Sequence, residues 1–224
     1  MCFSAGASFG ASAILGVVGA IAISKAKTSP ERLFAATPLL FAVQQFTEGM
    51  LWLSLKNPGL EPYQSFFTYT FLVFAMMVWP TWIPYTIRRL EKDENQKKIM
   101  NVLLSLGIVI SLGIGYVLVV YPVQVMTGNH HLHYMFDFPA VTKSFIWLFT
   151  ILYCMTTIVT PFISSIKRMR WLGFIFLASW LFALFFYNGF VVSIWCYFAA
   201  VMSIVVVWIV AGISKKQLAV EVLQ

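Results

Sequence analysis

The stretch IMNVLLSLGIVISLGIGYVLVVY, residues 99–121, contains no Asp, Glu, Lys, Arg or His. A helix of roughly 18 or more such residues is long enough to cross the hydrocarbon core of a bilayer. Its apolar residues follow one another directly, without the alternation of apolar and polar residues that a membrane-spanning strand shows. We therefore predict that this stretch crosses a membrane as an α-helix, with its backbone hydrogen bonds closed within the helix.

The composition extends this prediction to the whole chain. Of the 224 residues, 60% are hydrophobic and only 10% are charged, whereas about a quarter of the residues of a soluble domain are charged. The sequence therefore predicts one all-α membrane domain, residues 1–224, built as a bundle of seven transmembrane helices. A turn at Asn188-Gly189 separates the last two. The predicted spans cover residues 5–24, 33–55, 66–87, 99–121, 144–166, 171–187 and 190–213.

The basic residues predict how the chain is oriented. Thirteen of the 15 Lys and Arg residues fall in the connections after the first, third and fifth predicted spans or in the C-terminal tail, and only Lys56 and Lys143 lie on the other side. Cytoplasmic loops carry this excess of basic residues. We expect a multi-pass protein of the cell inner membrane with its N-terminus outside and its C-terminus in the cytoplasm. The net charge of +7 is explained in this way, so nucleic acid is not expected as a partner.

Glu48 is the one acidic residue inside a predicted span. Gln44, Gln45 and Trp52 lie four or three residues away from it, which places them on the same helix face. A carboxylate inside a membrane is costly and marks a candidate functional site. We predict that Glu48 is catalytic, as a general base or a metal ligand, and that Gln44, Gln45 and Trp52 line its pocket. A structural glutamate that ties helices together is the alternative.

The longest external connection, residues 122–143, contains all three histidines of the chain, His130, His131 and His133. In an extended segment alternate residues point the same way, so His131 and His133 could bind one metal ion, whereas a helix would pair His130 with His133. Imidazole suits zinc, and the two methionines that flank the cluster would also suit copper. We predict these histidines as metal ligands and Tyr134 as a pocket residue. A solvated His-rich loop is the alternative.

The N-terminus is predicted to lie on the same outward side as the histidines and the nearer end of the Glu48 helix. Its Cys2 can bind a metal as a thiolate, and Ser4 would line the same pocket. An idle thiol at a frayed terminus is the alternative. Zinc held by three protein ligands, with one open position, activates water near neutral pH. Cys2 is therefore a further predicted zinc ligand.

Two parts of the sequence resemble a known family. The chain opens with MCFSAGASF, and the second predicted span carries Pro38-Leu39-Leu40-Phe41, Gln44-Gln45, Glu48-Gly49 and Trp52. These residues resemble an uncharacterised family of bacterial multispan membrane proteins that open with Met-Cys-Phe-Ser-Ala. The resemblance implies a bacterial inner-membrane protein. It implies no activity, because none is known for the family.

Three functions are consistent with these residues. We favour a zinc-dependent membrane hydrolase or lyase that acts on a lipid or small molecule from the outer leaflet. A small-solute transporter or channel is the second hypothesis, in which Pro80 and Pro84 kink or end the third span. The third is a noncatalytic protein that binds a metal, heme or a lipid. The sequence leaves the substrate, the oligomeric state and the choice between enzyme and transporter open.

Overall fold

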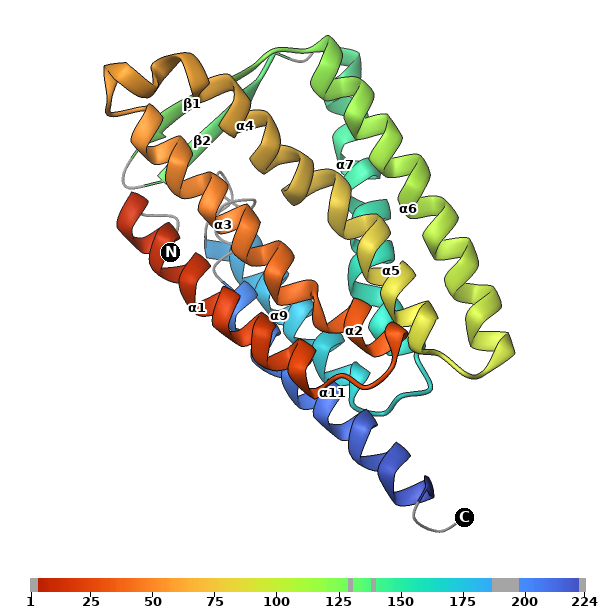
Figure 1. Cartoon of the computed structure of the whole chain (residues 1–224). Helices are drawn as coiled ribbons and strands as arrows, with labels where there is room; N and C mark the ends of the chain where they lie inside the picture. The colour runs from red at the N-terminus through yellow and green to blue at the C-terminus, as the bar shows by residue number, and fades with distance from the viewer. Residues whose placement is uncertain (1–3, 129–130, 138–139, 187–197, 222–224) are drawn as a thin grey trace.

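A computed structural model of the chain describes residues 4–128, 131–137, 140–186 and 198–221. Long helices run side by side in a bundle, and a β-hairpin lies at one end of it (Figure 1). Two π-helical turns, η2 and η3, and one 3-10 turn, η1, join some of the helices. The elements are α1 (Ala5–Lys25), α2 (Ser29–Ala35), α3 (Thr37–Ser54), η1 (Pro58–Tyr63), α4 (Gln64–Leu72), η2 (Val73–Val78), α5 (Trp79–Leu90), α6 (Glu94–Val120), β1 (Val123–Gly128), β2 (His131–Phe136), α7 (Ala140–Cys154), η3 (Met155–Val159), α8 (Thr160–Ile163), α9 (Met169–Phe186) and α11 (Ala199–Glu221).

The helices fall where the apolar runs of the sequence predict them. Three continuous helical segments among the described residues are long and apolar enough to cross a membrane: Ala5–Lys25, Pro58–Leu90 and Glu94–Val120. Shorter apolar helices cover Trp147–Ile163, Met169–Phe185 and Val201–Ser214. The predicted second span begins later than expected, because α2 precedes α3 as a separate short helix. The predicted turn at Asn188-Gly189 lies outside the described residues.

The helix that contains Pro80 and Pro84 does not end at them. It continues through α5 to Leu90, so of the two predicted effects of these prolines, a kink or an end of the helix, the structure excludes the end. A π-helical turn, η2, comes directly before α5. A wider turn of this kind accommodates a residue that breaks the regular hydrogen-bond ladder. Pro80 therefore fits within the helix, because neighbouring helices supply donors to the backbone carbonyls that it leaves unpaired.

Two hydrogen bonds to η2 show how this is done. The Tyr153 hydroxyl donates to the Ala75 carbonyl at 2.9 Å. The Ser111 hydroxyl donates to the Met77 carbonyl at 2.7 Å. Backbone carbonyls buried without a donor are costly, and here α6 and α7 provide the donors. The irregular turn of one helix is thereby stabilised by the side chains of two others.

Glycines allow the closest helix contacts. A Cβ atom at Gly107 would lie 1.9 Å from the Pro80 carbonyl oxygen, so only glycine lets α6 approach α5 this closely. A Cβ atom at Gly49 of α3 would lie 2.7 Å from the Phe9 ring of α1. Small residues at such positions are the usual means by which membrane helices pack. The second contact brings α1 against the polar part of α3.

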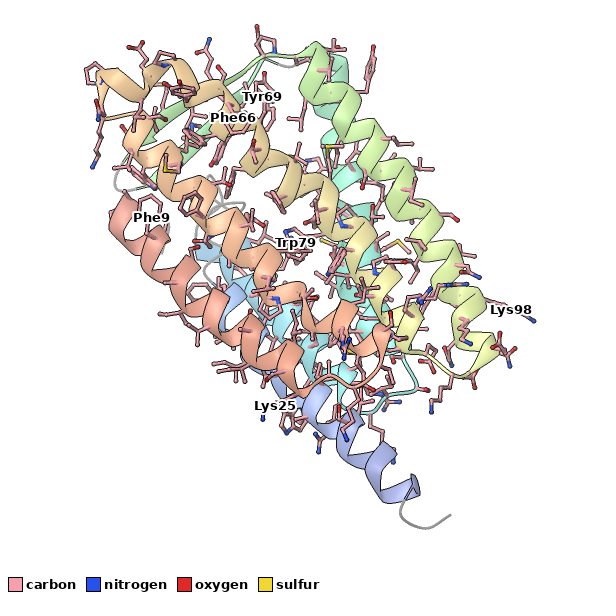
Figure 2. The ribbon with its side chains drawn as sticks, viewed as in Figure 1. Phe9, Lys25, Phe66, Tyr69, Trp79 and Lys98 are labelled. Carbon is pink, nitrogen blue, oxygen red and sulfur yellow. The ribbon has the colours of Figure 1, made fainter. Side chains whose placement is uncertain are left out.

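The two ends of the bundle differ in chemistry. Lys25 and Lys98 lie at the end away from the hairpin, whereas Phe66 and Tyr69 lie toward the hairpin (Figure 2). The predicted cytoplasmic connections therefore gather at one end of the bundle. Every acidic residue except Glu48 was expected outside the predicted spans. Glu91 is instead buried, with 3% of its surface exposed.

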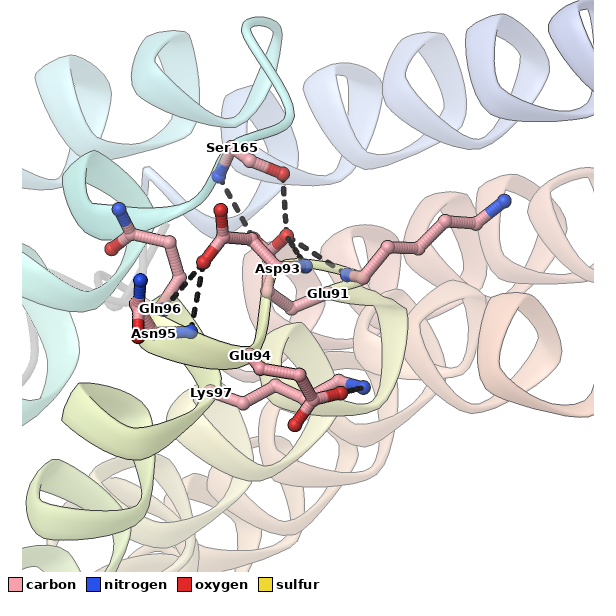
Figure 3. Close-up of polar contacts among 8 residues, drawn as sticks. Glu91, Asp93, Glu94, Asn95, Gln96, Lys97 and Ser165 are labelled. Carbon is pink, nitrogen blue, oxygen red and sulfur yellow. Dashed lines mark hydrogen bonds and ion pairs between the residues drawn. The ribbon is translucent and has the colours of Figure 1, made fainter.

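Glu91 ties two connections together. One of its carboxylate oxygens, Oε1, accepts hydrogen bonds from the Lys92 amide at 2.9 Å, the Asp93 amide at 3.1 Å and the Ser165 hydroxyl. The other, Oε2, accepts from the Ser165 amide at 2.8 Å and the Ser164 hydroxyl at 3.1 Å. Figure 3 shows Glu91 between its own loop and Ser165. The carboxylate therefore joins the α5–α6 connection to the α8–α9 connection.

These donors decide the charge of Glu91. Burial by itself would raise the pKa of Glu91, but the hydrogen bonds from Ser165, Asp93 and Lys92 outweigh it and hold the pKa below its ordinary value of 4.5. A depressed pKa in the folded state stabilises the fold above the pKa of the unfolded chain. That stabilisation is lost as the pH falls from about 4.5 through the lower, folded-state pKa.

We predict that Glu91→Gln lowers the free energy of unfolding by about 1.5–3 kcal/mol at pH 7, because charge-assisted hydrogen bonds are lost. The difference from the wild type should shrink as the pH falls below about 4.5. Denaturant unfolding in detergent at several pH values measures this. The matched control is Glu94→Gln, because Glu94 makes only a surface ion pair with Lys97 at 2.7 Å. It should cost under about 1 kcal/mol. Equal losses in both variants would contradict the assignment.

Candidate functional site

The polar face predicted for the second span is buried inside the bundle. Gln44 and Glu48 have no exposed surface, Gln45 is 1% exposed and Trp52 is 3% exposed. All of them belong to α3, which begins at Thr37 with a proline in its first turn. Proline is favoured there because the first amides of a helix have no partner within it. These side chains, which were predicted to line one pocket, are therefore all buried in the interior of the bundle.

Glu48 contacts α1 through a residue that the sequence analysis missed. The Ser8 hydroxyl donates to Glu48 Oε2 at 3.3 Å, and Ser8 is fully buried. The close packing of Gly49 on Phe9 brings the two helices near enough for this bond. Ser8 lies in a run of small residues, where the sequence gives no sign of a polar role. The bond therefore depends on how α1 and α3 are docked.

The Gln44 side chain links α3 to α5. The Trp79 indole Nε1 donates to Gln44 Oε1 at 2.9 Å. The Phe41 ring stacks on the Trp79 ring with their centroids 3.9 Å apart and the planes at 22°. Trp79 lies at mid-height in the bundle (Figure 2). One turn of α3 is thus joined to α5 by a stacked pair of rings and a buried hydrogen bond.

Gln45 and Trp52 differ from Gln44. Both side-chain polar atoms of Gln45, Oε1 and Nε2, are buried without a hydrogen-bond partner in the described part of the chain, and so is Trp52 Nε1. The Lys56 ammonium lies 5.5 Å from the centre of the Trp52 ring. These two side chains thus have the burial of core residues and polar atoms that the protein leaves unpaired.

The histidines predicted as metal ligands belong to a β-hairpin. β1 and β2 pair antiparallel, with His133 opposite Met126 and His131 opposite Gly128. The segment is therefore extended, which agrees with the pairing of alternate residues and not with the helical alternative. Cys2, His130 and the His131 side chain lie outside the described residues. The hairpin also adds two strands to a chain predicted as all-α.

The hairpin packs on the end of α3 that carries Trp52 (Figure 1). Val125 and Leu132 form a small apolar cluster with Leu51 and Trp52. The residues packed against this cluster include Ala5, Leu55, Phe67 and Tyr134. The first turn of α1, the end of α3 and the histidine hairpin therefore meet in one place.

The remaining predicted pocket residues have local roles. The Ser4 hydroxyl caps α1 by accepting a hydrogen bond from the Ala7 amide at 3.2 Å. The Tyr134 ring stacks on Phe71, with the centroids 5.4 Å apart. Among the described residues, no three His, Cys, Asp or Glu side chains are grouped closely enough to hold a metal ion. Glu48 and His133 are the predicted ligands whose side chains the structure describes.

Glu31 was also missed as a buried residue. It has no exposed surface, and its carboxylate accepts hydrogen bonds from the Lys27 amide at 2.9 Å and the Ser214 hydroxyl at 2.8 Å. Burial would raise the pKa of Glu31, but these donors hold it below its ordinary value. Thr28, three residues before Glu31, caps α2, and this spacing is a capping signal that the sequence does carry. Glu31 therefore ties α2 to α11 at the basic end.

The fold and the buried row on α3 define a class of protein: a bundle of apolar helices, three of them long enough to cross a membrane among the described residues, with a polar face turned inward. The chain belongs to a family of unknown function, DUF6629, whose family model matches residues 1–220. This agrees with the resemblance of its opening residues and second span to an uncharacterised family. No curated protein and no solved structure matches the chain.

We predict that Gln44→Met and Trp79→Phe each lower the free energy of unfolding by about 1–3 kcal/mol, because each leaves a buried polar group unpaired. The double variant should lose less than the sum of the two, since the residues share one hydrogen bond. Thermal and denaturant unfolding of the four proteins gives the interaction energy. Strict additivity of the two losses would show that the Gln44–Trp79 bond contributes nothing.

Proposed function

We propose that the protein is a multi-pass protein of the inner membrane with seven spans, its N-terminus outside and its C-terminus in the cytoplasm. The long apolar helices support insertion in a membrane. The gathering of basic connections at the end opposite the hairpin supports the orientation (Figure 2). In this orientation the hairpin and the Trp52 end of α3 face outward.

We further propose that the outward pocket binds zinc and that the protein is a zinc-dependent hydrolase or lyase acting on a membrane lipid or small molecule. The observation that carries this is Glu48, a fully buried carboxylate inside an apolar bundle. A buried carboxylate is stable only when it is protonated, hydrogen-bonded or paired with a cation. Cys2, His130, His131 and His133 supply the ligand types that zinc prefers, and copper is the second choice.

The chemistry assigns a role to each group. Zinc with an open position would lower the pKa of a bound water toward neutrality. Glu48 would accept the proton of that water as general base, or bind the metal itself. The Ser8 hydroxyl, at 3.3 Å from Glu48 Oε2, would fix the orientation of the carboxylate.

A transporter or channel for a small solute is the second candidate, and one observation favours it. η2 and η3 are π-helical turns inside two apolar helices, and such turns often lie at functional sites. In this reading Glu48 binds the solute or a proton along the path. A noncatalytic protein that binds a metal, heme or a lipid would use the same carboxylate.

We predict about one zinc per chain in protein purified without a histidine tag, measured by mass spectrometry of the metal. Glu48→Ala, Cys2→Ser and the double variant His131→Ala/His133→Ala should each lose most of it, because each removes a proposed ligand. Glu61→Ala is the control, since Glu61 is an exposed carboxylate in η1 at the same end. It should retain the metal.

A metal-free wild type would exclude the zinc enzyme, and the transporter would then be tested by solute uptake into vesicles. If the wild type contains copper instead of zinc and the same variants lose it, the proposed ligands stand but the proposed zinc chemistry does not. Metal that survives in all three variants would place the ion elsewhere.

We also predict which connections face outward. In a chain with Cys2→Ser, Cys154→Ala and Cys196→Ala, a cysteine at Glu61 should react with a membrane-impermeant maleimide on intact cells. A cysteine at Lys98 should react only after the cells are opened, because the basic connections are expected inside. Both positions are exposed, so the protein itself blocks neither. The reverse labelling pattern would overturn the proposed orientation.

A further inference from the structure

Gln45, Glu48 and Trp52 form a row along one face of α3. They are three and four residues apart, so their side chains follow one another on the same side of the helix. With a rise of 1.5 Å per residue, Gln45 and Trp52 are separated by about 10 Å along the helix axis. All are buried, with exposures of 1%, 0% and 3% respectively. Glu48 is therefore flanked, one turn away on each side, by a buried polar side chain.

The unpaired atoms of this row need an explanation. Folded proteins pair roughly 90% or more of their buried polar groups. Gln45 Oε1, Gln45 Nε2 and Trp52 Nε1 have no partner in the described part of the chain. They are concentrated within two turns of one helix, beside a buried carboxylate. Unpaired buried polar atoms of this kind call for an explanation such as a bound water, ion or ligand.

The neighbouring glutamine shows that the protein can close such bonds. Gln44 accepts a hydrogen bond from the Trp79 indole at 2.9 Å. Gln45 is one residue further along the same helix and is also buried, yet the described residues give its side chain no donor or acceptor. The difference between the two glutamines is that Gln44 joins α3 to α5, whereas Gln45 has no hydrogen-bond partner among the described residues.

The atoms of the row define the chemistry of the ligand. Trp52 Nε1 only donates, Gln45 both donates and accepts, and a Glu48 carboxylate accepts. Hydroxyl groups satisfy all of these, because each can donate and accept. An anion is disfavoured beside the Glu48 carboxylate, since like charges repel. Lys56 lies over the Trp52 ring, with its ammonium 5.5 Å from the ring centre, and is itself exposed.

We infer that the row Gln45–Glu48–Trp52 binds an uncharged polyol group about two helical turns long, such as two linked sugar rings. The group is either a free sugar or the headgroup of a glycolipid. The inference rests on the outward pocket of the proposed function and names the class of its substrate, but it does not require the metal. The hydroxyls donate to Glu48 and Gln45 Oε1 and accept from Gln45 Nε2 and Trp52 Nε1.

The test follows the Trp52 indole by NMR in protein labelled with 15N on tryptophan. The protein is stripped of metal with a chelator and kept in a detergent without hydroxyl groups, lauryldimethylamine oxide. Maltose is the free probe, and dodecyl maltoside presents the same headgroup on an alkyl chain. The Trp52 signal, assigned with Trp52→Phe, should shift saturably as a probe binds. The Trp79 signal should stay in place, because its N–H is already bonded to Gln44.

The outcomes separate the sources of the ligand. A shift with both probes indicates that free sugars are accepted, and a shift with dodecyl maltoside alone indicates a lipid headgroup. If the Trp52 signal shifts with neither probe, the inference is overturned, and water is then the partner of the row. Because metal is absent throughout, loss of zinc binding and loss of polyol binding are distinguishable results.

Two glutamine variants give a second, independent readout. Gln45→Met should weaken probe binding at least tenfold, while its melting temperature without probe is equal to or higher than that of the wild type. This follows because the substitution removes unpaired buried atoms at nearly constant volume. Gln44→Met should lower the melting temperature, because it breaks the bond to Trp79. A Gln45→Met variant that melts as low as Gln44→Met would make Gln45 structural and overturn the inference.

Discussion

The structure depends on one constraint: a polar group inside an apolar bundle must find its partner within the protein. The π-helical turn before Pro80 is tolerated because Tyr153 and Ser111 donate to its carbonyls at 2.9 and 2.7 Å. The contact between α5 and α6 requires a glycine at position 107 for the same reason, since the backbones must come close for these bonds to form. Close helix packing and the pairing of polar groups therefore depend on each other in this protein, and small residues at the contacts permit both.

The two ends of the bundle satisfy that constraint in different ways. At the basic end, buried carboxylates of Glu31 and Glu91 receive donors from loops that are distant in sequence, which binds those loops together. Toward the hairpin, Glu48 receives a donor from Ser8, but Gln45 and Trp52 keep unpaired polar atoms in the described part of the chain. Buried polar atoms without a partner in the described part of the chain occur at both ends, since Glu31 Oε1 and Arg88 Nε at the basic end are among them. The row on α3 differs from these in that it includes the buried carboxylate of Glu48.

The proposed metal and the proposed polyol ligand use different parts of this site. Amide and indole N–H groups do not bind cations, so Gln45 Nε2 and Trp52 Nε1 are suited to the oxygen atoms of an organic ligand. Carboxylate, imidazole and thiolate groups are suited to the metal. A hydrolase needs both kinds of group, whereas a noncatalytic binding protein needs only the first. Glu48 is the residue common to the two, because a carboxylate can serve a cation or a hydroxyl.

The sequence by itself determined the helices, because apolar runs and turn signals are local properties: the helices over residues 5–24 and 99–121 are confirmed as α1 and α6. It also singled out Glu48 as a carboxylate inside a helix, because a single acidic residue within an apolar run is visible in the sequence alone. Only the tertiary structure decided that Gln44 is bonded to Trp79 while Gln45 is not, and that Glu31 and Glu91 are buried. The packing of the hairpin on the end of α3 was likewise decided by the tertiary structure. In each case the deciding partner is far away in the chain, 35 residues for Gln44 and Trp79 and 183 for Glu31 and Ser214, and no local pattern specifies which distant groups will meet.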